Sequence, residues 1–146
     1  MKCEEVMLNH VYSCSETATA QQCARLMKTH NIGFVPVVDD QKRVVGVVTD
    51  RDLALRLVAE GRPATDPVSE LMTFRDLLTC KRDEDIEVLE ERMAREKTAR
   101  ALVVDDEGTC IGVISLSDVA QFEQPGRAAR LLHELVHREA IRIARS

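Results

Sequence analysis

The stretch that decides the fold of this 146-residue chain lies at residues 46–52, which read Gly-Val-Val-Thr-Asp-Arg-Asp. A matching stretch, Gly-Val-Ile-Ser-Leu-Ser-Asp, follows 66 positions later at residues 112–118. In both, an apolar strand-like run leads to a Thr or Ser and then, three positions on, to an Asp. Self-similarity at a fixed spacing is typical of chains built from repeated structural units. The sequence therefore predicts two copies of one unit.

Residues on the N-terminal side of these stretches repeat as well. Residues 37–40 and 103–106 both read Val-Val-Asp-Asp, again 66 positions apart. The Val-Met pair at residues 6–7 recurs 65 positions later as Leu-Met, which indicates one inserted residue near the start of the second copy. The two copies together account for most of the chain, from Val6 to Phe122.

Hydrophobic spacing predicts the order β-α-β-β-α for each copy. Apolar side chains recur at helical intervals after residue 17, whereas two later apolar runs flank a polar turn, as in a hairpin of buried strands. In the first copy we expect a strand at residues 11–13, a helix at 17–29, strands at 34–38 and 44–49, and a helix from Asp50 that stops at Gly61.

The second copy follows a short linker. Asp66 followed by Pro67 is a favourable start for a helix over residues 68–72. Beyond that helix we expect a second one through Ile86, Leu89 and Met93, strands at 101–104 and 110–115, and a last helix at 117–122.

These expectations divide the chain into a first repeat at residues 1–62, a second repeat at 63–124 and a C-terminal amphipathic helix at 125–146. The fold class is α/β, or α+β in a broader sense, with two packed half-domains, because a chain of this length is too short for two independent cores. The apolar stripe of the last helix needs a surface, either the protein's own core or a partner chain.

Composition excludes several classes of function. Lys and Arg number 20 against 25 Asp and Glu, a net charge of −5, so the overall field repels nucleic-acid phosphates. One Tyr, three Phe and no Trp provide few platforms for base stacking. No apolar run is long enough to span a membrane, and the charged N-terminus does not resemble a signal peptide, so we expect a cytoplasmic protein. Five cysteines without a Cys-x-x-Cys spacing favour free thiols over a disulfide framework: Cys3, Cys14, Cys23, Cys80 and Cys110.

The order Pro-Val-Val-Asp at residues 36–39, a turn, and then Gly-h-h-[Ser/Thr]-x-x-Asp, where h is apolar, closely resembles the cystathionine-β-synthase (CBS) domain family. The resemblance implies a stand-alone bacterial type of CBS pair, in which two repeats pack about a pseudo-twofold axis. It further implies clefts between the repeats that bind adenosine compounds such as AMP, ADP, ATP or S-adenosylmethionine. The second copy departs from the pattern, because Leu102 stands where the first copy has Pro36.

The resemblance also implies that the ligand contacts lie at two strand-to-helix corners. In the first copy Asp52 is suited to accept hydrogen bonds from a ribose diol, Thr49 ends the strand beside it, and Gly46 allows a ligand or another backbone to approach closely. Arg51 is a candidate phosphate partner, and Pro36 belongs to the pocket wall. The candidates in the second copy are Ser115, Asp118 and Arg100.

We therefore expect a regulatory protein that senses an adenosine-containing ligand, requires no cofactor, forms a homodimer and acts on a regulated protein that the sequence does not identify. Enzymatic turnover is not expected, because no nucleophile, base and orienting group can be assembled. A ligand-free structural or dimerisation module is the first alternative.

A second alternative comes from His133-Glu134-Leu135-Val136-His137, which matches the His-Glu-x-x-His pattern of zinc hydrolases. On a helix this spacing places two imidazoles on one face, with the glutamate as general base. A third ligand is not visible, because the nine residues after His137 contain no histidine. The pattern is more typical here of an amphipathic helix that carries two histidines, and we expect no metal.

Overall fold

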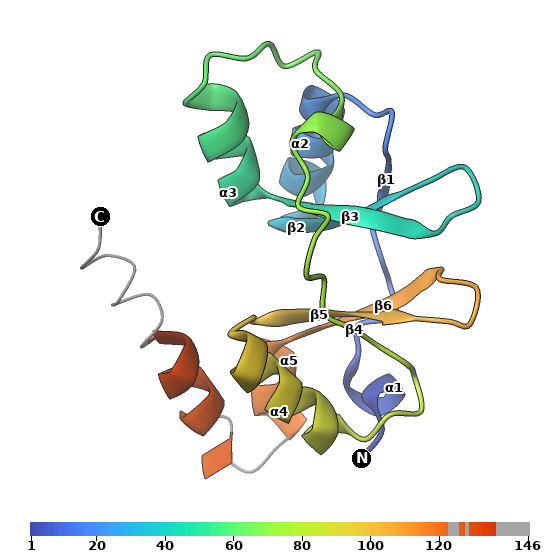
Figure 1. Ribbon diagram of the computed structural model, residues 1–146, viewed down its shortest axis with the longest axis vertical. Coiled ribbons are helices and arrows are strands. Elements are labelled where there is room, and N and C mark those ends of the chain that lie inside the picture. The colour runs from blue at the N-terminus through green and yellow to red at the C-terminus, as the bar shows by residue number, and fades with distance from the viewer. Residues whose placement is uncertain (123–125, 128, 137–146) are drawn as a thin grey trace. The chain divides into compact units, whose positions relative to one another are not determined.

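The computed structural model describes residues 1–122, 126–127 and 129–136. The chain divides into two compact units (Figure 1). We call Tyr12–Leu77 together with Glu107–Cys110 the first-repeat unit. The second-repeat unit comprises Met1–Val11, Leu78–Asp106 and the chain from Ile111 onward. The α/β fold class is confirmed, since each unit combines a three-stranded sheet with helices.

The first-repeat unit follows the predicted order of elements. They are β1 (Cys14–Ser15), α2 (Ala20–His30), β2 (Phe34–Val38), β3 (Val44–Thr49), α3 (Asp50–Asp52), η1 (Leu53–Val58) and η2 (Val68–Glu70). Strand β2 lies at the centre of the sheet, parallel to β1 and antiparallel to β3. Helices α2 and α3 lie on the same face of this sheet (Figure 1). The two hairpin strands have the predicted bounds.

Helix α2 begins where its sequence provides a cap. The Thr19 hydroxyl accepts a hydrogen bond from the Gln22 N–H (3.1 Å), and the Gln22 side chain accepts one from the Thr19 N–H (2.9 Å). This reciprocal capping satisfies two amides that the helix cannot pair internally, so the helix starts at Ala20 rather than at residue 17. It ends at Asn31, whose φ of 52° is left-handed.

Two short elements of this unit differ from the prediction. The strand expected at residues 11–13 lies at Cys14–Ser15, because these are the residues that pair in parallel with β2. The helix expected at residues 68–72 is a single 3-10 turn, preceded by Pro67 in an extended conformation with ψ of 145°. Only the turn, and not a full helix, leads from one repeat to the next.

The last helix of the first-repeat unit starts at the predicted position. Thr49 caps α3, and the chain then continues into the wider turns of the π-helix η1. Gly61 has a φ of 64°, a left-handed conformation that glycine adopts without strain, and it ends the segment as predicted.

The second-repeat unit follows the same plan, with a sheet of order β4-β5-β6. Its elements are α1 (Cys3–Val6), β4 (Thr79–Cys80), α4 (Ile86–Glu96), β5 (Arg100–Val104), β6 (Cys110–Ser115) and α5 (Leu116–Phe122). Strand β4 pairs with β5 in parallel, as β1 does with β2. Helix α1 was not predicted, and β4 was expected only from the β-α-β-β-α order of the repeat, without bounds.

The compact units do not coincide with the sequence repeats at residues 1–62 and 63–124, because each repeat gives its leading segment to the other unit. Val68 and Leu71, which precede the second repeat's strands, are fully buried in the core of the first-repeat unit. Cys3 and Val6 are buried in the core of the second-repeat unit. Each segment adds apolar side chains that close a core too small to be covered by its own repeat.

Residues 1–11 and 63–77 each belong to one sequence repeat and to the other compact unit, and we call them the exchanged segments. Equivalent backbone hydrogen bonds hold both of them. The Val47 N–H donates to the Thr73 carbonyl (2.8 Å), and the Leu8 N–H donates to the Val113 carbonyl (2.9 Å). A Cβ on Gly46 would lie 2.6 Å from the Met72 sulfur. The glycine at the start of the deciding stretch therefore makes room for the exchanged segment.

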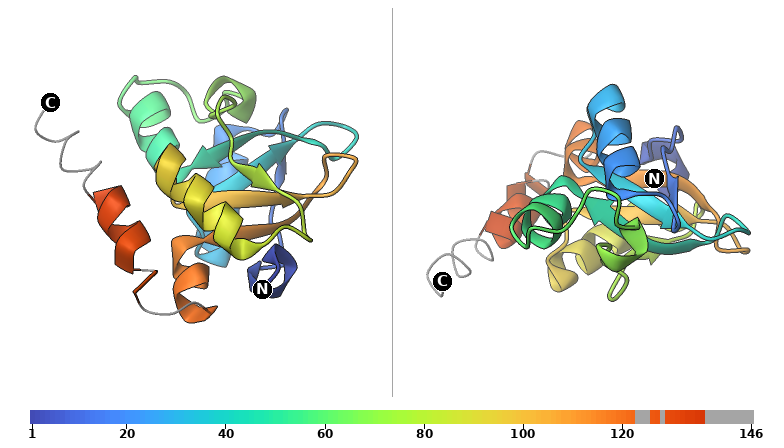
Figure 2. Two further views of the ribbon diagram at one scale, coloured as in Figure 1. Left: turned by 60° about the horizontal axis from the view of Figure 1, so that its bottom comes forward. Right: turned by 90° about the horizontal axis from the view of Figure 1, so that it is seen from above.

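After α5, the described residues between 126 and 136 are helical. This segment lies beside α4 (Figure 2). Leu131 is buried in the core of the second-repeat unit, whereas Leu132 and Val136 are 51% and 55% exposed. The predicted apolar stripe is thus split between the protein's own core and solvent, and its later part lies outside the described residues.

Candidate functional site

The first corner is built from a reciprocal cap at the junction of β3 and α3. The Thr49 hydroxyl accepts a hydrogen bond from the Asp52 N–H (3.0 Å), and one Asp52 carboxylate oxygen, Oδ2, accepts one from the Thr49 N–H (3.0 Å). The Asp52 side chain is only 14% exposed. The carboxylate is therefore held in one orientation by its own helix start.

A cation lies beside the other oxygen of that carboxylate. The Arg56 Nε is 3.8 Å from Asp52 Oδ1, one helical turn further along. Arg56 Nη1 also donates to the carbonyls of Leu71 (3.1 Å) and Met72 (3.0 Å). The guanidinium is thus fixed between the corner and the segment that leads to the second repeat.

A pocket of about 280 Å³ lies next to this guanidinium. The Arg75 guanidinium carbon lies 5.4 Å from the centre of the Phe74 ring. The pocket therefore combines two positive charges and one aromatic ring with apolar surface. Its lining belongs entirely to the first-repeat unit: Arg56, Met72, Thr73, Phe74 and Arg75.

The second corner has the same cap, with a different residue at the position that Arg56 occupies in the first. Asp118 Oδ2 accepts hydrogen bonds from both the Ser115 N–H (2.7 Å) and the Ser115 hydroxyl (2.8 Å). Asp118 is more deeply buried than its counterpart, at 8% exposure. The residue four positions after Asp118 is Phe122, where the first corner has arginine. An apolar ring cannot supply the charge that Arg56 brings to the first corner.

The strand residue that differs between the copies has a structural reason. In the first-repeat unit Pro36 is buried in β2 opposite Val47. In the second-repeat unit the Leu102 N–H donates to the Leu78 carbonyl (2.9 Å), a bond that proline cannot make. Leucine at position 102, in place of proline, therefore allows one more backbone hydrogen bond between β5 and the residue that precedes β4.

The remaining predicted residues serve other contacts or lie at the surface. Arg51 and Arg100 are exposed, at the start of α3 and of β5 respectively. Asp39 closes the β2–β3 turn, because its carboxylate accepts hydrogen bonds from the Arg43 N–H and the Arg43 side chain (both 2.9 Å). The Arg43 amide in particular lowers the pKa of Asp39. This aspartate of the Pro-Val-Val-Asp sequence is a turn residue.

Sequence reasoning missed Arg56, Phe74 and Arg75. The spacing between Asp52 and Arg56 is a helical i, i+4 ion-pair spacing, so this arginine could have been found from the sequence. Phe74 and Arg75 carried no such signal, because they join the pocket only through the exchanged segment.

The histidine pattern falls partly outside the described residues. His133 is exposed on the helical segment after α5, and His137 lies outside the residues that the structure describes. Among the described residues no group of three or more His, Cys, Asp or Glu side chains is placed to hold a metal ion.

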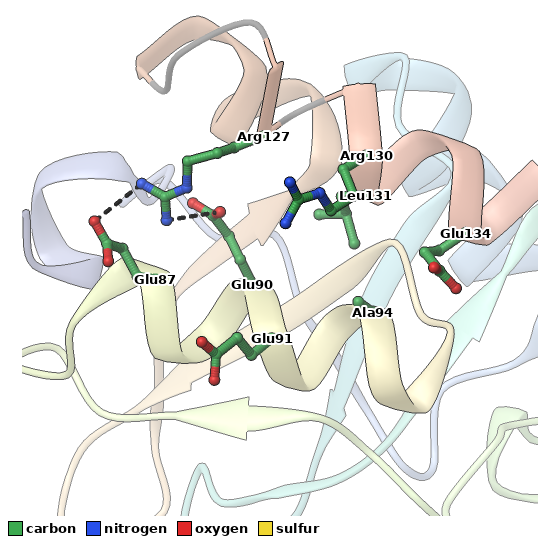
Figure 3. Close-up of a pocket in the computed structure, with 8 residues that line it drawn as sticks. All are labelled: Glu87, Glu90, Glu91, Ala94, Arg127, Arg130, Leu131 and Glu134. Carbon is green, nitrogen blue, oxygen red and sulfur yellow. Dashed lines mark hydrogen bonds and ion pairs between the residues drawn. The ribbon is translucent and has the colours of Figure 1, made fainter.

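A second pocket, of about 250 Å³, lies between α4 and this helical segment (Figure 3). Arg127 bridges Glu87 and Glu90, with nitrogen–oxygen distances of 3.0 Å to each. Figure 3 shows these ion pairs at one end of the pocket, which is lined by acidic side chains of α4 and by Arg130, Leu131 and Glu134. The ion pairs attach the helical segment to its own unit.

Known proteins share this arrangement of two repeats. The family model described as "CBS domain" matches the chain twice, over residues 3–59 and 68–124. The chain belongs to the CBS domain family. The CBS domain-containing protein YhcV of Bacillus subtilis is 33% identical over 139 residues, with coverage of 92% of this chain and 97% of YhcV. Several longer relatives, among them enzymes, match this CBS pair over only about a quarter of their length.

Solved CBS structures match the fold. The CBS domain protein PAE2072 of Pyrobaculum aerophilum, complexed with AMP, has a TM-score of 0.73 and 26% identity, with coverage of 94% of this chain and 99% of that chain. The CBS domain pair of protein MJ0100, in complex with 5′-methylthioadenosine and S-adenosylmethionine, has a TM-score of 0.73 and 22% identity, with coverage of 83% and 98%. In the described part of this CBS pair, no helix is long and apolar enough to cross a membrane.

Proposed function

We propose that this CBS pair is a regulatory protein that binds an adenosine-containing ligand at the Thr49–Asp52 corner, without catalysing a reaction. The observation that carries the proposal is the pocket lined by Arg56, Phe74 and Arg75, because the same Arg56 has its Nε 3.8 Å from the Asp52 carboxylate. The AMP complex of the related protein PAE2072 supports the ligand class.

Each part of such a ligand finds matching chemistry there. Asp52 Oδ1 is not used by the cap, so it is the oxygen proposed to accept a ribose hydroxyl. The Phe74 ring offers a face for the adenine, and the two arginines offer charge-assisted hydrogen bonds to phosphate. Thr49 and Gly46 hold the corner and the exchanged segment in place, while Pro36 shapes the buried strand behind them.

The size of the pocket favours a small nucleotide. Its volume of about 280 Å³ is near the lower end of ligand pockets, which span ~300–1,000 Å³. Asp50 and Asp52 also add negative charge at the corner, which opposes a multiply charged phosphate. We therefore favour AMP over ADP, ATP or S-adenosylmethionine. The second corner, with Ser115, Asp118 and Arg100, is proposed as the weaker site.

One observation favours a ligand-free module instead. At both corners the Asp and its Thr or Ser partner are fully explained as helix caps, so neither residue needs a ligand to account for it. The exposed Leu132 and Val136 are compatible with both the ligand-binding protein and the ligand-free module. Apolar side chains on the surface favour a homodimer or a regulated partner protein in either case.

Calorimetric titration of the purified protein with AMP, with GMP as the comparison, separates the two functions. We expect AMP to bind and GMP to bind at least ten-fold more weakly. Asp52→Asn keeps a side-chain oxygen for the cap but removes the charge, and should lower AMP affinity roughly 10- to 100-fold, since hydrogen bonds to charged groups contribute ~1.5–3 kcal/mol.

The matched control is Asp118→Asn, which makes the same change at the second corner and should lower the affinity of the tighter site less than three-fold. If the wild-type protein binds no adenosine compound, the ligand-free module is the correct function. If both variants bind AMP as the wild type does, the protein binds the ligand elsewhere and the proposed corner site is wrong.

A further inference from the structure

The exchanged segment 63–77 supplies most of the pocket proposed as the ligand site. Four of the five described lining residues belong to it: Met72, Thr73, Phe74 and Arg75. The fifth, Arg56, belongs to η1. The pocket is therefore formed only while the segment lies against the rest of the first-repeat unit, and a ligand held by the whole pocket contacts both sides of that junction.

Core packing and one pair of backbone hydrogen bonds hold this segment. Val68 and Leu71 are fully buried among the core side chains of the first-repeat unit. The Val47 N–H donates to the Thr73 carbonyl, and the Thr73 N–H donates to the Val47 carbonyl, both at 2.8 Å. The next residue, Phe74, is 58% exposed. The Phe74 ring therefore lies directly beyond these anchors and depends on them for its position.

The Arg56 guanidinium joins the segment to the first corner. Its Nη1 donates to the carbonyls of Leu71 and Met72, which follow the 3-10 turn η2, where carbonyls lack N–H partners within the turn. Its Nε lies 3.8 Å from Asp52 Oδ1. Among the described residues Arg56 makes no other hydrogen bond or ion pair, so Nη2 can donate to a phosphate oxygen without releasing the carbonyls. A phosphate and the segment therefore use different nitrogens of one planar group.

We propose that ligand binding in this pocket and docking of the exchanged segment 63–77 are one coupled equilibrium, in which the ligand holds the segment in place and Arg56 is the positioning residue that links the two. This coupling rests on the proposed function, since AMP is taken as the ligand, and it identifies the part of the chain that responds to the ligand. That part leads into the second-repeat unit at Leu78.

Thermodynamic linkage gives the direction and size of the effect. A ligand that binds the docked form and not the opened form reduces opening of the segment, by about 100-fold when the free ligand is at a hundred times its Kd. The carbonyls of Leu71 and Met72 already hold the Arg56 side chain in one orientation, so less side-chain entropy is lost when a phosphate binds there. Ligand and docked segment therefore stabilise each other.

The exchanged segment 1–11 provides an internal control, because it has the backbone contacts without the arginine. Leu8 and Val113 make the same pair of hydrogen bonds, at 2.9 and 3.1 Å. The residue equivalent to Arg56 is Phe122, whose side chain has no hydrogen-bond donor. Phe122 therefore cannot tie that segment to the second corner as Arg56 ties its counterpart to the first.

The test combines calorimetry with amide hydrogen exchange of the full chain, measured by NMR without AMP and with AMP at about a hundred times its calorimetric Kd. We expect AMP to slow hydrogen exchange of the Val47 and Thr73 amides about 10- to 100-fold. Hydrogen exchange of the Leu8 and Val113 amides should slow less than about three-fold.

The calorimetry distinguishes failure of the two proposals. If AMP binding is absent, or is unaffected by Asp52→Asn, the proposed site and the coupling are both wrong. If AMP binds and Asp52→Asn weakens it, but the Val47 and Thr73 amides exchange as before, the proposed function stands and the coupling is wrong. Equal slowing of these amides and those of Leu8 and Val113 would also overturn the coupling, because it would show a general gain in stability.

The role of Arg56 is tested by a substitution that keeps its charge. Arg56→Lys replaces the planar group with one ammonium, which cannot reach both carbonyls, Asp52 and a phosphate together. Without ligand it should speed hydrogen exchange of the Thr73 amide roughly ten-fold, and it should weaken AMP binding roughly five- to ten-fold.

Arg62→Lys is the matched control. Arg62 pairs with Asp66 and Glu70 at the start of the same segment and does not line the pocket. Since surface ion pairs contribute little to stability, this variant should change both quantities less than about three-fold. Unchanged hydrogen exchange at Thr73 in Arg56→Lys, or a larger change in Arg62→Lys, would overturn the role of Arg56 as the link.

Discussion

The two strand-to-helix corners share their backbone chemistry and differ in their charge. At both, a Thr or Ser and an Asp cap a helix reciprocally, with hydrogen bonds of 2.7–3.0 Å from the strand amide to the carboxylate. Beside Asp52 stands Arg56, and beside Asp118 the equivalent position is Phe122. The Thr/Ser-x-x-Asp sequence therefore specifies the helix cap at each corner. The charge available to a ligand depends on residues outside that sequence.

The exchanged segments, in contrast to the side chains around the corners, pack in the same way in the two units. Gly46 meets Met72 in the first-repeat unit, and Gly112 meets Met7 in the second. Each glycine lies in the strand that leads to its corner. The structural frame of the two corners is therefore similar, and the pocket beside the first arises from the side chains added to that frame.

The largest expected effect concerns the exchanged segments. Leu71→Ala removes a fully buried side chain from the core of the first-repeat unit and should lower the free energy of unfolding by about 3 kcal/mol. Val6→Ala, at the equivalent position 65 residues earlier, should cost about 2 kcal/mol because a smaller side chain is lost.

Denaturant unfolding measures both losses, and amide hydrogen exchange locates them. For Leu71→Ala we expect the greater loss of protection in β2 and β3, and for Val6→Ala in β5 and β6. Loss of protection in the repeat that contains each residue in the sequence, rather than in the unit that buries it, would contradict the exchange.

The next effect tests the charge difference between the corners. Arg56→Met keeps much of the side-chain stem but removes the guanidinium, and should weaken AMP binding roughly 10- to 50-fold through the loss of ~1.5–2.3 kcal/mol. Arg51→Met is the matched control, since Arg51 is exposed and does not line the pocket, and should change the affinity less than three-fold.

Calorimetry on the two arginine variants at one salt concentration provides the comparison. A larger loss for Arg51→Met would show that the exposed arginine, and not Arg56, is the phosphate partner.

The smallest expected effect concerns the two glycines. A Cβ at Gly46 would lie 2.9 Å from the Thr73 carbonyl oxygen, which the backbone cannot easily move, so Gly46→Ala should cost about 1–2 kcal/mol. At Gly112 the nearest atoms all belong to the flexible Met7 side chain, so Gly112→Ala should cost about half as much. Thermal unfolding of both variants checks the order, and equal or reversed losses would rule out backbone crowding as the cause.

Much of the fold followed from the sequence because its signals are local. The strands at Phe34–Val38, Val44–Thr49 and Cys110–Ser115 have their predicted bounds, since short apolar runs on either side of a polar turn leave few alternatives. The corners were found because a cap depends on residues only three positions apart. The strand expected at residues 11–13 was misplaced, because two residues carry almost no periodicity of their own.

The sequence by itself determined that this protein consists of two CBS repeats and where each capped corner lies. Only the tertiary structure decided which unit buries Leu71 and Val6, and that Phe74 and Arg75 join Arg56 in one pocket. The physical reason is that repeats, strands and caps arise from residues close together in the chain. Segment exchange and the pocket depend instead on packing between distant residues, which local sequence patterns do not encode.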